Sequence, residues 1–136
     1  MVARWWAEIS HKFPCVEIDE FIVMPNHFHG IVVLVEPDPV GADLRVRPDG
    51  GAHPDRGTHA GVPLHTVVQW FKTMTTNEYI REVKRYGWRP YPGKLWQRNY
   101  YEHIIRDEIE WNLIRNYIIN NPLNWKNDGE FKEDDR

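Results

Sequence analysis

Two runs of β-favouring residues stand near the start of the chain, over residues 16–24 and 27–36. Val, Ile and Phe are frequent in both runs, and these residue types are typical of β-strands. Pro25 and Asn26 separate the runs and are common turn residues. The pattern therefore predicts an antiparallel hairpin. Both faces of its second strand carry apolar side chains, which indicates a strand covered on both sides.

Apolar positions three or four residues apart predict three helices, over residues 3–12, 64–86 and 107–120. The middle helix is the longest. Thr66 and Gln69 match a capping box near its start. Its expected buried stripe consists of Leu64, Val67, Val68, Phe71, Met74 and Thr75.

The last helix has clear signals at both ends. Asp107 is a favourable N-cap with Glu110 three residues later, and Pro122 ends the helix. Before it, residues 95–105 are rich in aromatic and β-branched residues and predict a third strand. His103 in this segment is better explained as a strand histidine than as a metal ligand, because no partner is spaced to join it.

Composition predicts one globular domain over residues 1–125. The chain is 41% hydrophobic and 27% charged, as is usual for such a domain. Residues 37–63 are rich in Pro, Gly, Asp and Arg and predict a flexible loop insertion. Residues 126–136 predict a polar tail. The single Cys15 excludes an internal disulfide and fits a reducing compartment, and no apolar run reaches membrane-spanning length.

Basic residues are concentrated in one part of a chain whose net charge is −3. Residues 69–106 contain eight basic and three acidic side chains, a local charge of +5, with aromatic residues interleaved. Such a segment can bind a phosphate backbone and stack bases. A solvated helix face followed by an aromatic strand explains the pattern equally well. The candidate DNA contacts are Lys72, Arg81, Lys84, Arg85, Lys94, Trp96 and Arg98.

Two pairs of polar residues are candidates for chemistry. His27 and His29 are two positions apart on the second strand and therefore share a face. Two imidazoles placed in this way can bind a metal ion, although such a pair alone is more often structural. Tyr117 and Asn121 are four residues apart near the end of the last helix and lie close to one face. Spacing alone favours a core tyrosine and a helix-ending asparagine.

Four blocks of the sequence resemble the REP-associated tyrosine transposases, which belong to the single-tyrosine HUH class. The blocks are VMPNHFHGIVVL, WFKTMTTNEYI, KLWQRNYYEHIIRDE and RNYIINNPLNW. They cover nearly the whole chain in the family's order. The resemblance implies an α+β fold with a ferredoxin-like antiparallel sheet and helices on one face. Members usually carry a further strand before the first helix, so the sheet is expected to lack its first strand.

The resemblance also implies an activity and a set of roles. The expected protein is a cytoplasmic enzyme without membrane contact, monomeric or homodimeric, that cleaves and rejoins single-stranded or hairpin DNA of repetitive elements. His27, His29 and Asn121 are the implied ligands of Mg²⁺ or Mn²⁺, and Tyr117 is the implied nucleophile of a 5′-phosphotyrosine intermediate. Two alternatives stay open. One is an inactive DNA-binding protein derived from such a transposase, and the other is an unrelated metal phosphoesterase that uses His27 and His29.

Overall fold

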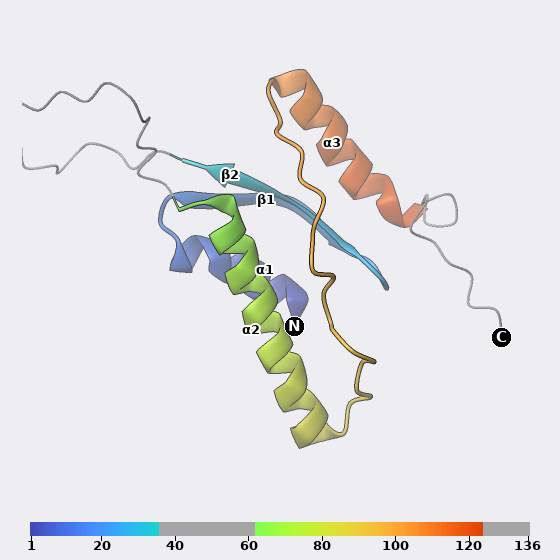
Figure 1. Ribbon diagram of the computed structural model, residues 1–136. Helices are drawn as coiled ribbons and strands as arrows, with labels where there is room; N and C mark the ends of the chain where they lie inside the picture. The colour runs from blue at the N-terminus through green and yellow to red at the C-terminus, as the bar shows by residue number, and fades with distance from the viewer. Residues whose placement is uncertain (36–61, 124–136) are drawn as a thin grey trace, which may run out of the picture.

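A computed structural model describes residues 1–35 and 62–123 (Figure 1). Its described elements are α1 (Val2–Lys12), β1 (Val16–Val23), β2 (Phe28–Leu34), α2 (Leu64–Tyr86) and α3 (Glu108–Asn120). The two strands form an antiparallel sheet, so the predicted α+β class is confirmed, and the arrangement matches part of a ferredoxin-like fold. Nearly all of the predicted loop 37–63 and the tail 126–136 lie outside the described residues. None of the helices described is long and apolar enough to cross a bilayer.

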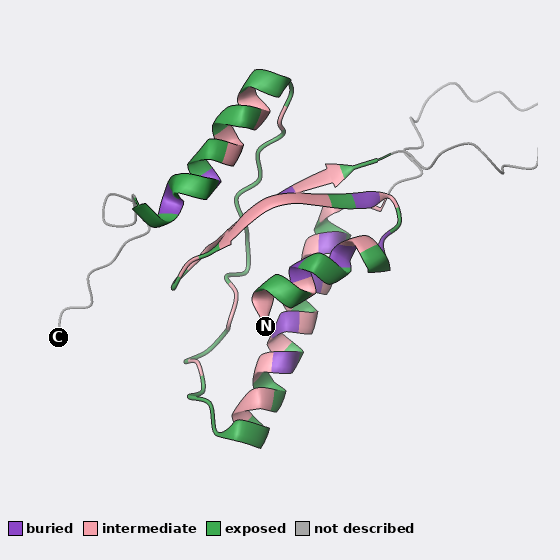
Figure 2. Ribbon diagram, turned by 180° about the vertical axis from the view of Figure 1, so that it is seen from behind, coloured by how far each residue is buried: buried purple, intermediate pink, exposed green. Residues whose placement is uncertain are grey.

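The helices lie on both faces of the sheet (Figures 1 and 2). Successive residues of β2 point to opposite faces. Phe28 contacts Trp6 of α1, with ring centroids 4.9 Å apart, whereas His29 contacts Tyr117 of α3 at 5.6 Å. The expectation that all helices share one face is therefore wrong for α3. The reason is that both faces of β2 carry apolar side chains, and each face needs a covering element.

The hydrophobic core lies between α1, α2 and one face of the hairpin, where Figure 2 shows most of the buried positions. Trp6 is its centre, because its ring also contacts Phe71 of α2 at 5.6 Å. Edge-to-face ring contacts of this kind add stability beyond the area that they bury. The buried cluster comprises Trp6, Ile9, Phe13, Val16, Val67 and Phe71.

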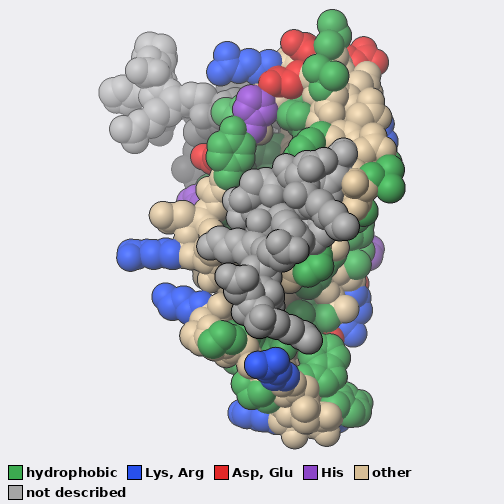
Figure 3. Space-filling model, turned by 90° about the vertical axis from the view of Figure 1, so that its right-hand side faces the viewer, with side chains coloured by type: hydrophobic (Ala, Val, Ile, Leu, Met, Phe, Trp, Pro, Cys, Tyr) green, Lys and Arg blue, Asp and Glu red, His purple; other side chains and the backbone are tan. Residues whose placement is uncertain are grey.

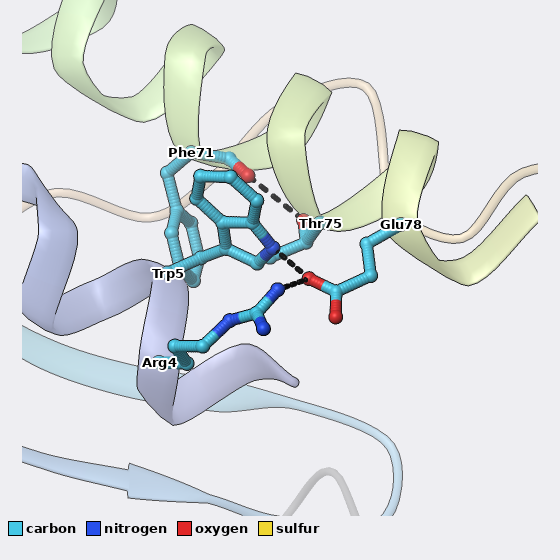
Figure 4. A network of polar contacts seen from close by, with 5 residues as sticks. All are labelled: Arg4, Trp5, Phe71, Thr75 and Glu78. Atoms are coloured by element: carbon cyan, nitrogen blue, oxygen red, sulfur yellow. Dashed lines mark hydrogen bonds and ion pairs between the residues drawn. The ribbon is translucent and has the colours of Figure 1, made fainter. Parts of the chain in front are cut away.

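A polar contact joins α1 to α2 beside this core (Figure 4). Glu78 of α2 is only 9% exposed, and its Oε2 accepts hydrogen bonds from the Arg4 guanidinium and the Trp5 indole of α1. Thr75, one turn earlier, donates its hydroxyl to the Phe71 carbonyl at 2.8 Å. Since a buried carboxylate is costly without partners, these donors explain how Glu78 is accommodated.

The bounds of α2 agree with the prediction, but its predicted capping box is wrong. The N-cap is Pro63, and no side chain caps the helix start. Thr66 and Gln69 already lie inside the first turns, whereas a capping side chain must precede the helix. Gly87 ends the helix in the left-handed region, with φ of 68°. Within the expected stripe, Val67, Phe71 and Thr75 are buried, and Leu64, Val68 and Met74 are half-buried.

The predicted strand over residues 95–105 is also wrong, because residues 87–107 contain no helix or strand. A strand needs a hydrogen-bonded partner, and within the described part of the chain β1 and β2 pair only with each other. Side chains hold this segment against α2 instead. Trp96 Nε1 donates to Thr75 Oγ1 at 2.8 Å, and Lys72 Nζ donates to the Gln97 carbonyl at 2.8 Å.

Candidate functional site

His27 and His29 lie where the hairpin turns. The Met24 N–H donates to the His27 carbonyl at 2.9 Å and closes the turn, and β2 begins at the next residue. The two imidazole centroids are 4.7 Å apart, with their planes inclined at 73°. The predicted shared face is therefore confirmed. Two rings at this separation can both direct a nitrogen at a single cation.

A neighbouring amide contacts the ring of His27. Its Nδ1 lies 2.7 Å from Asn26 Oδ1. An amide oxygen only accepts hydrogen bonds, so the contact is a hydrogen bond in the tautomer that has its proton on Nδ1 and its lone pair on Nε2. Metal-binding histidines commonly donate their second N–H in this way, which fixes the ring orientation. The contact is therefore compatible with a ligand role for His27.

Helix α3 places Tyr117 beside this pair. Figure 1 shows the second half of α3 next to the turn end of the hairpin, and the Tyr117 and His29 rings are 5.6 Å apart. Tyr117 is 51% exposed, whereas the next residue, Ile118, is 3% exposed and buried. The interpretation of Tyr117 as a core tyrosine, which spacing alone favoured, is therefore wrong. Its ring lies at the surface, next to the histidines.

Asn121 follows α3 directly, one turn after Tyr117, and is 2% exposed. Among residues 1–35 and 62–123, no three His, Cys, Asp or Glu side chains gather as a metal site. The ligand set that the sequence resemblance implies, two imidazoles and the amide of Asn121, stays a prediction. Nitrogen and oxygen donors with few charges fit Mn²⁺, and they fit Mg²⁺ where phosphate oxygens complete the coordination shell.

The start of α3 is capped as predicted. The Glu110 N–H donates to Asp107 Oδ1 at 2.7 Å, and Glu110 Oε2 accepts from the Arg106 N–H at 2.9 Å. His103 Nε2 contacts the other oxygen of Glu110, so His103 lies against the helix start rather than on a strand. The Arg106 N–H and then His103 lower the pKa of Glu110, because both stabilise its charged form.

The candidate DNA contacts divide into two groups. Trp96 packs on Phe71 with ring centroids 5.6 Å apart, so its ring contributes to packing on α2. Lys72 Nζ lies 5.3 Å from the centroid of the Tyr100 ring, and burial lowers the pKa of Lys72. The remaining candidates are exposed and stay predictions: Arg81, Lys84, Arg85, Lys94 and Arg98.

Sequence reasoning missed two acidic residues that contact α3. Asp19 and Glu20 of β1 bind Arg115, and Asp19 also accepts a hydrogen bond from Trp111. Nothing in the local pattern distinguishes them from solvated strand residues. Only the register of the hairpin, described below, explains why both carboxylates reach α3.

Comparison with known proteins identifies one relative and no family. A protein of Haemophilus influenzae that is described only as uncharacterized is 37% identical over 127 residues. The match covers 93% of this chain and 66% of that protein, so the chain spans just under two thirds of the relative's length. No family model and no solved structure matches the chain.

Proposed function

We propose that this protein is a metal-dependent DNA strand-transfer enzyme of the REP-associated tyrosine transposase kind. The observation that carries the proposal is the contact of Tyr117 with His29, at 5.6 Å between ring centroids, next to the 4.7 Å contact of His29 with His27. A candidate nucleophile and a candidate metal pair from two distant parts of the chain thus lie close together. The resemblance of the four sequence blocks to the transposases implies the same arrangement.

The roles follow from the chemistry of each side chain. His27, His29 and Asn121 would hold a divalent ion, which when bound polarises the scissile phosphate. The Tyr117 hydroxyl is a weak nucleophile at neutral pH, but its side chain is half-exposed and a DNA strand can reach it. Attack forms a bond between the tyrosine oxygen and phosphorus and breaks the bond to the 3′-oxygen. The tyrosine proton is lost to solvent, and the departing 3′-oxygen gains a proton.

The proposed substrate is single-stranded or hairpin DNA. The phosphotyrosine ester keeps the energy of the broken bond, so a 3′-hydroxyl can attack it and rejoin the strand. The exposed basic side chains of α2 and of residues 94–98 support backbone binding. A cytoplasmic location, where such DNA occurs in a bacterium, belongs to the same proposal.

The test is adduct mapping. The protein is incubated with labelled hairpin DNA and Mn²⁺, and the adduct is located by peptide mass. We expect it on Tyr117, and Tyr117→Phe should abolish it while the fold survives, because only a half-exposed hydroxyl is removed. His27→Ala and His29→Ala should abolish the adduct but retain DNA binding, because each removes a ligand and leaves the basic segment intact.

Two results would contradict this assignment. An adduct on another tyrosine, or one that persists in Tyr117→Phe, would show a different nucleophile. DNA binding without any adduct in the unmodified protein would favour the binding-only alternative.

A further inference from the structure

The register of the hairpin contains one extra residue in β1. Ile18 pairs with Val32, and the next described pair is Phe21 with Gly30. β1 therefore advances three residues where β2 advances two, which is a β-bulge. In a regular strand Ile18 and Phe21 would point to opposite faces. Because of the bulge, both pack against the core on the side of α1 and α2.

The bulge also changes the direction of the two side chains between Ile18 and Phe21. Asp19 and Glu20 are adjacent, yet both reach α3 on the opposite face of the sheet. Arg115 Nε lies 3.3 Å from Asp19 Oδ2, and Arg115 Nη2 donates to Glu20 Oε1 at 3.3 Å. Trp111 Nε1, one turn earlier on α3, donates to Asp19 Oδ2 at 2.5 Å. We call these four residues the bulge clamp.

The bulge clamp defines the position of α3 on the sheet more closely than apolar packing alone does. The sheet-facing side of α3 continues from Trp111 and Arg115 to the buried Ile118, and apolar contacts of this kind are not directional. Hydrogen bonds to a charged acceptor depend on distance and angle. Contacts one turn apart therefore define both the axial position and the rotation of the helix. Tyr117 lies two residues after Arg115, so its position depends on them.

We propose that Asp19 and Glu20 are positioning residues, which hold α3 through Trp111 and Arg115 so that Tyr117 lies beside His29. The role of Tyr117 rests on the proposed function, but the placement of its ring does not. The clamp residues themselves touch no reacting atom. Their effect is on geometry, and a displacement of about 1 Å can lower a rate by about 100-fold.

The experiment compares three variants of the whole chain. Asp19→Ala/Glu20→Ala removes every acceptor of the clamp. Asp19→Asn/Glu20→Gln keeps oxygen acceptors for Trp111 and Arg115 and removes only the charges. Glu17→Ala is the matched control, because Glu17 is an exposed acid of the same strand that precedes the bulge. Folding is checked by thermal unfolding of each variant.

The first measurement needs no activity. The proximity of the Tyr117 and His29 rings is followed by the NMR cross-peak between their ring protons, together with amide exchange along α3. We expect the double alanine variant to lose the cross-peak and to exchange faster in α3 but not in α1 or α2. The Asn/Gln variant should keep a weaker cross-peak and serves as the test if the alanine variant does not fold. Glu17→Ala should match the unmodified protein.

The second measurement is single-turnover cleavage of hairpin DNA with Mn²⁺. We expect the rate to fall about 100-fold in the alanine variant and about 10-fold in the Asn/Gln variant, with DNA affinity changed less than about twofold. An unchanged cross-peak in the alanine variant, or a lost cross-peak with an unchanged rate, overturns the positioning role. If no form cleaves DNA, the proposed function fails, and the cross-peak alone decides whether the clamp positions Tyr117.

Discussion

At the scale of single residues, the contact between Gly30 and Trp6 limits how the core is built. A Cβ atom added at Gly30 would lie 2.5 Å from Trp6 Cζ2 and 2.6 Å from Cη2. Trp6 is 5% exposed and contacts the rings of Phe21, Phe28 and Phe71, so it has little room to move. The absence of a side chain at Gly30 is therefore what lets the indole lie against β2.

We expect Gly30→Ala to lower the free energy of unfolding by about 1–3 kcal/mol, as overpacking does. Denaturant unfolding of both proteins measures the difference. Trp6→Phe provides the matched background, because phenylalanine lacks the two indole atoms that would clash. In that background Gly30→Ala should lower the free energy of unfolding by clearly less. An equal cost in both backgrounds would show that the indole is not the cause.

Individual site residues were predictable to different degrees. The shared face of His27 and His29 follows from strand alternation, and the structure agrees. The place of Tyr117 does not follow from spacing, which favoured a core position, because spacing cannot show which element covers a helix. Trp96 is a different case. Its basic and aromatic neighbours indicated a DNA contact, which stays a prediction, but they did not indicate that its ring packs on Phe71.

At the scale of elements, local sequence signals predicted the helices correctly. They failed for segments whose structure depends on a partner far away in the chain. Asp107 caps α3 through a contact three residues away, and Gly87 ends α2 through its own backbone angle. Residues 95–105 have the composition of a strand, but pairing depends on a partner elsewhere in the chain, and in the described residues they do not pair. The bulge at Asp19 and Glu20 was equally invisible, since register is a property of two strands.

The capping cluster at the start of α3 predicts a dependence on pH. The pKa of Glu110 lies below its ordinary value of 4.5, because the Arg106 N–H and then His103 stabilise the carboxylate. A carboxyl group whose pKa falls on folding stabilises the fold above its ordinary pKa. This stabilisation is lost as the pH falls through the lowered value. We therefore expect the first turn of α3 to loosen in acid.

NMR of the amides of residues 106–112 during acidification measures this loosening. Glu110→Gln should remove the pH-dependent part of this loosening. It should also leave the first turn of α3 less stable at neutral pH, because the charged acceptor is gone. Glu108→Gln is the control, since Glu108 is an exposed acid in the same turn. If Glu110→Gln retains the full acid response, the response originates in another group.

At the scale of the whole molecule, the charge is unevenly distributed. The chain has a net charge of −3, yet residues 69–106 carry +5, and one of their three acids, Glu78, is paired with Arg4 of α1. Figure 3 shows acidic side chains gathered at the upper end of one face, with basic side chains also present there, and further basic side chains projecting from the lower half. An anionic polymer is therefore attracted most strongly to residues 69–106.

The last prediction is that hairpin DNA binds more tightly than plain duplex and that added salt weakens this binding steeply. Each phosphate contact releases a counterion and contributes about 0.7–0.9 to the slope of log Kd against log salt concentration. Arg81→Ala and Lys84→Ala, which remove exposed charges of α2, should each reduce the slope by about 1. Lys12→Ala, an exposed charge of α1 outside the basic segment, should leave it unchanged. Equal affinities for hairpin and duplex, insensitive to salt, would mean that the basic segment is only a solvated surface.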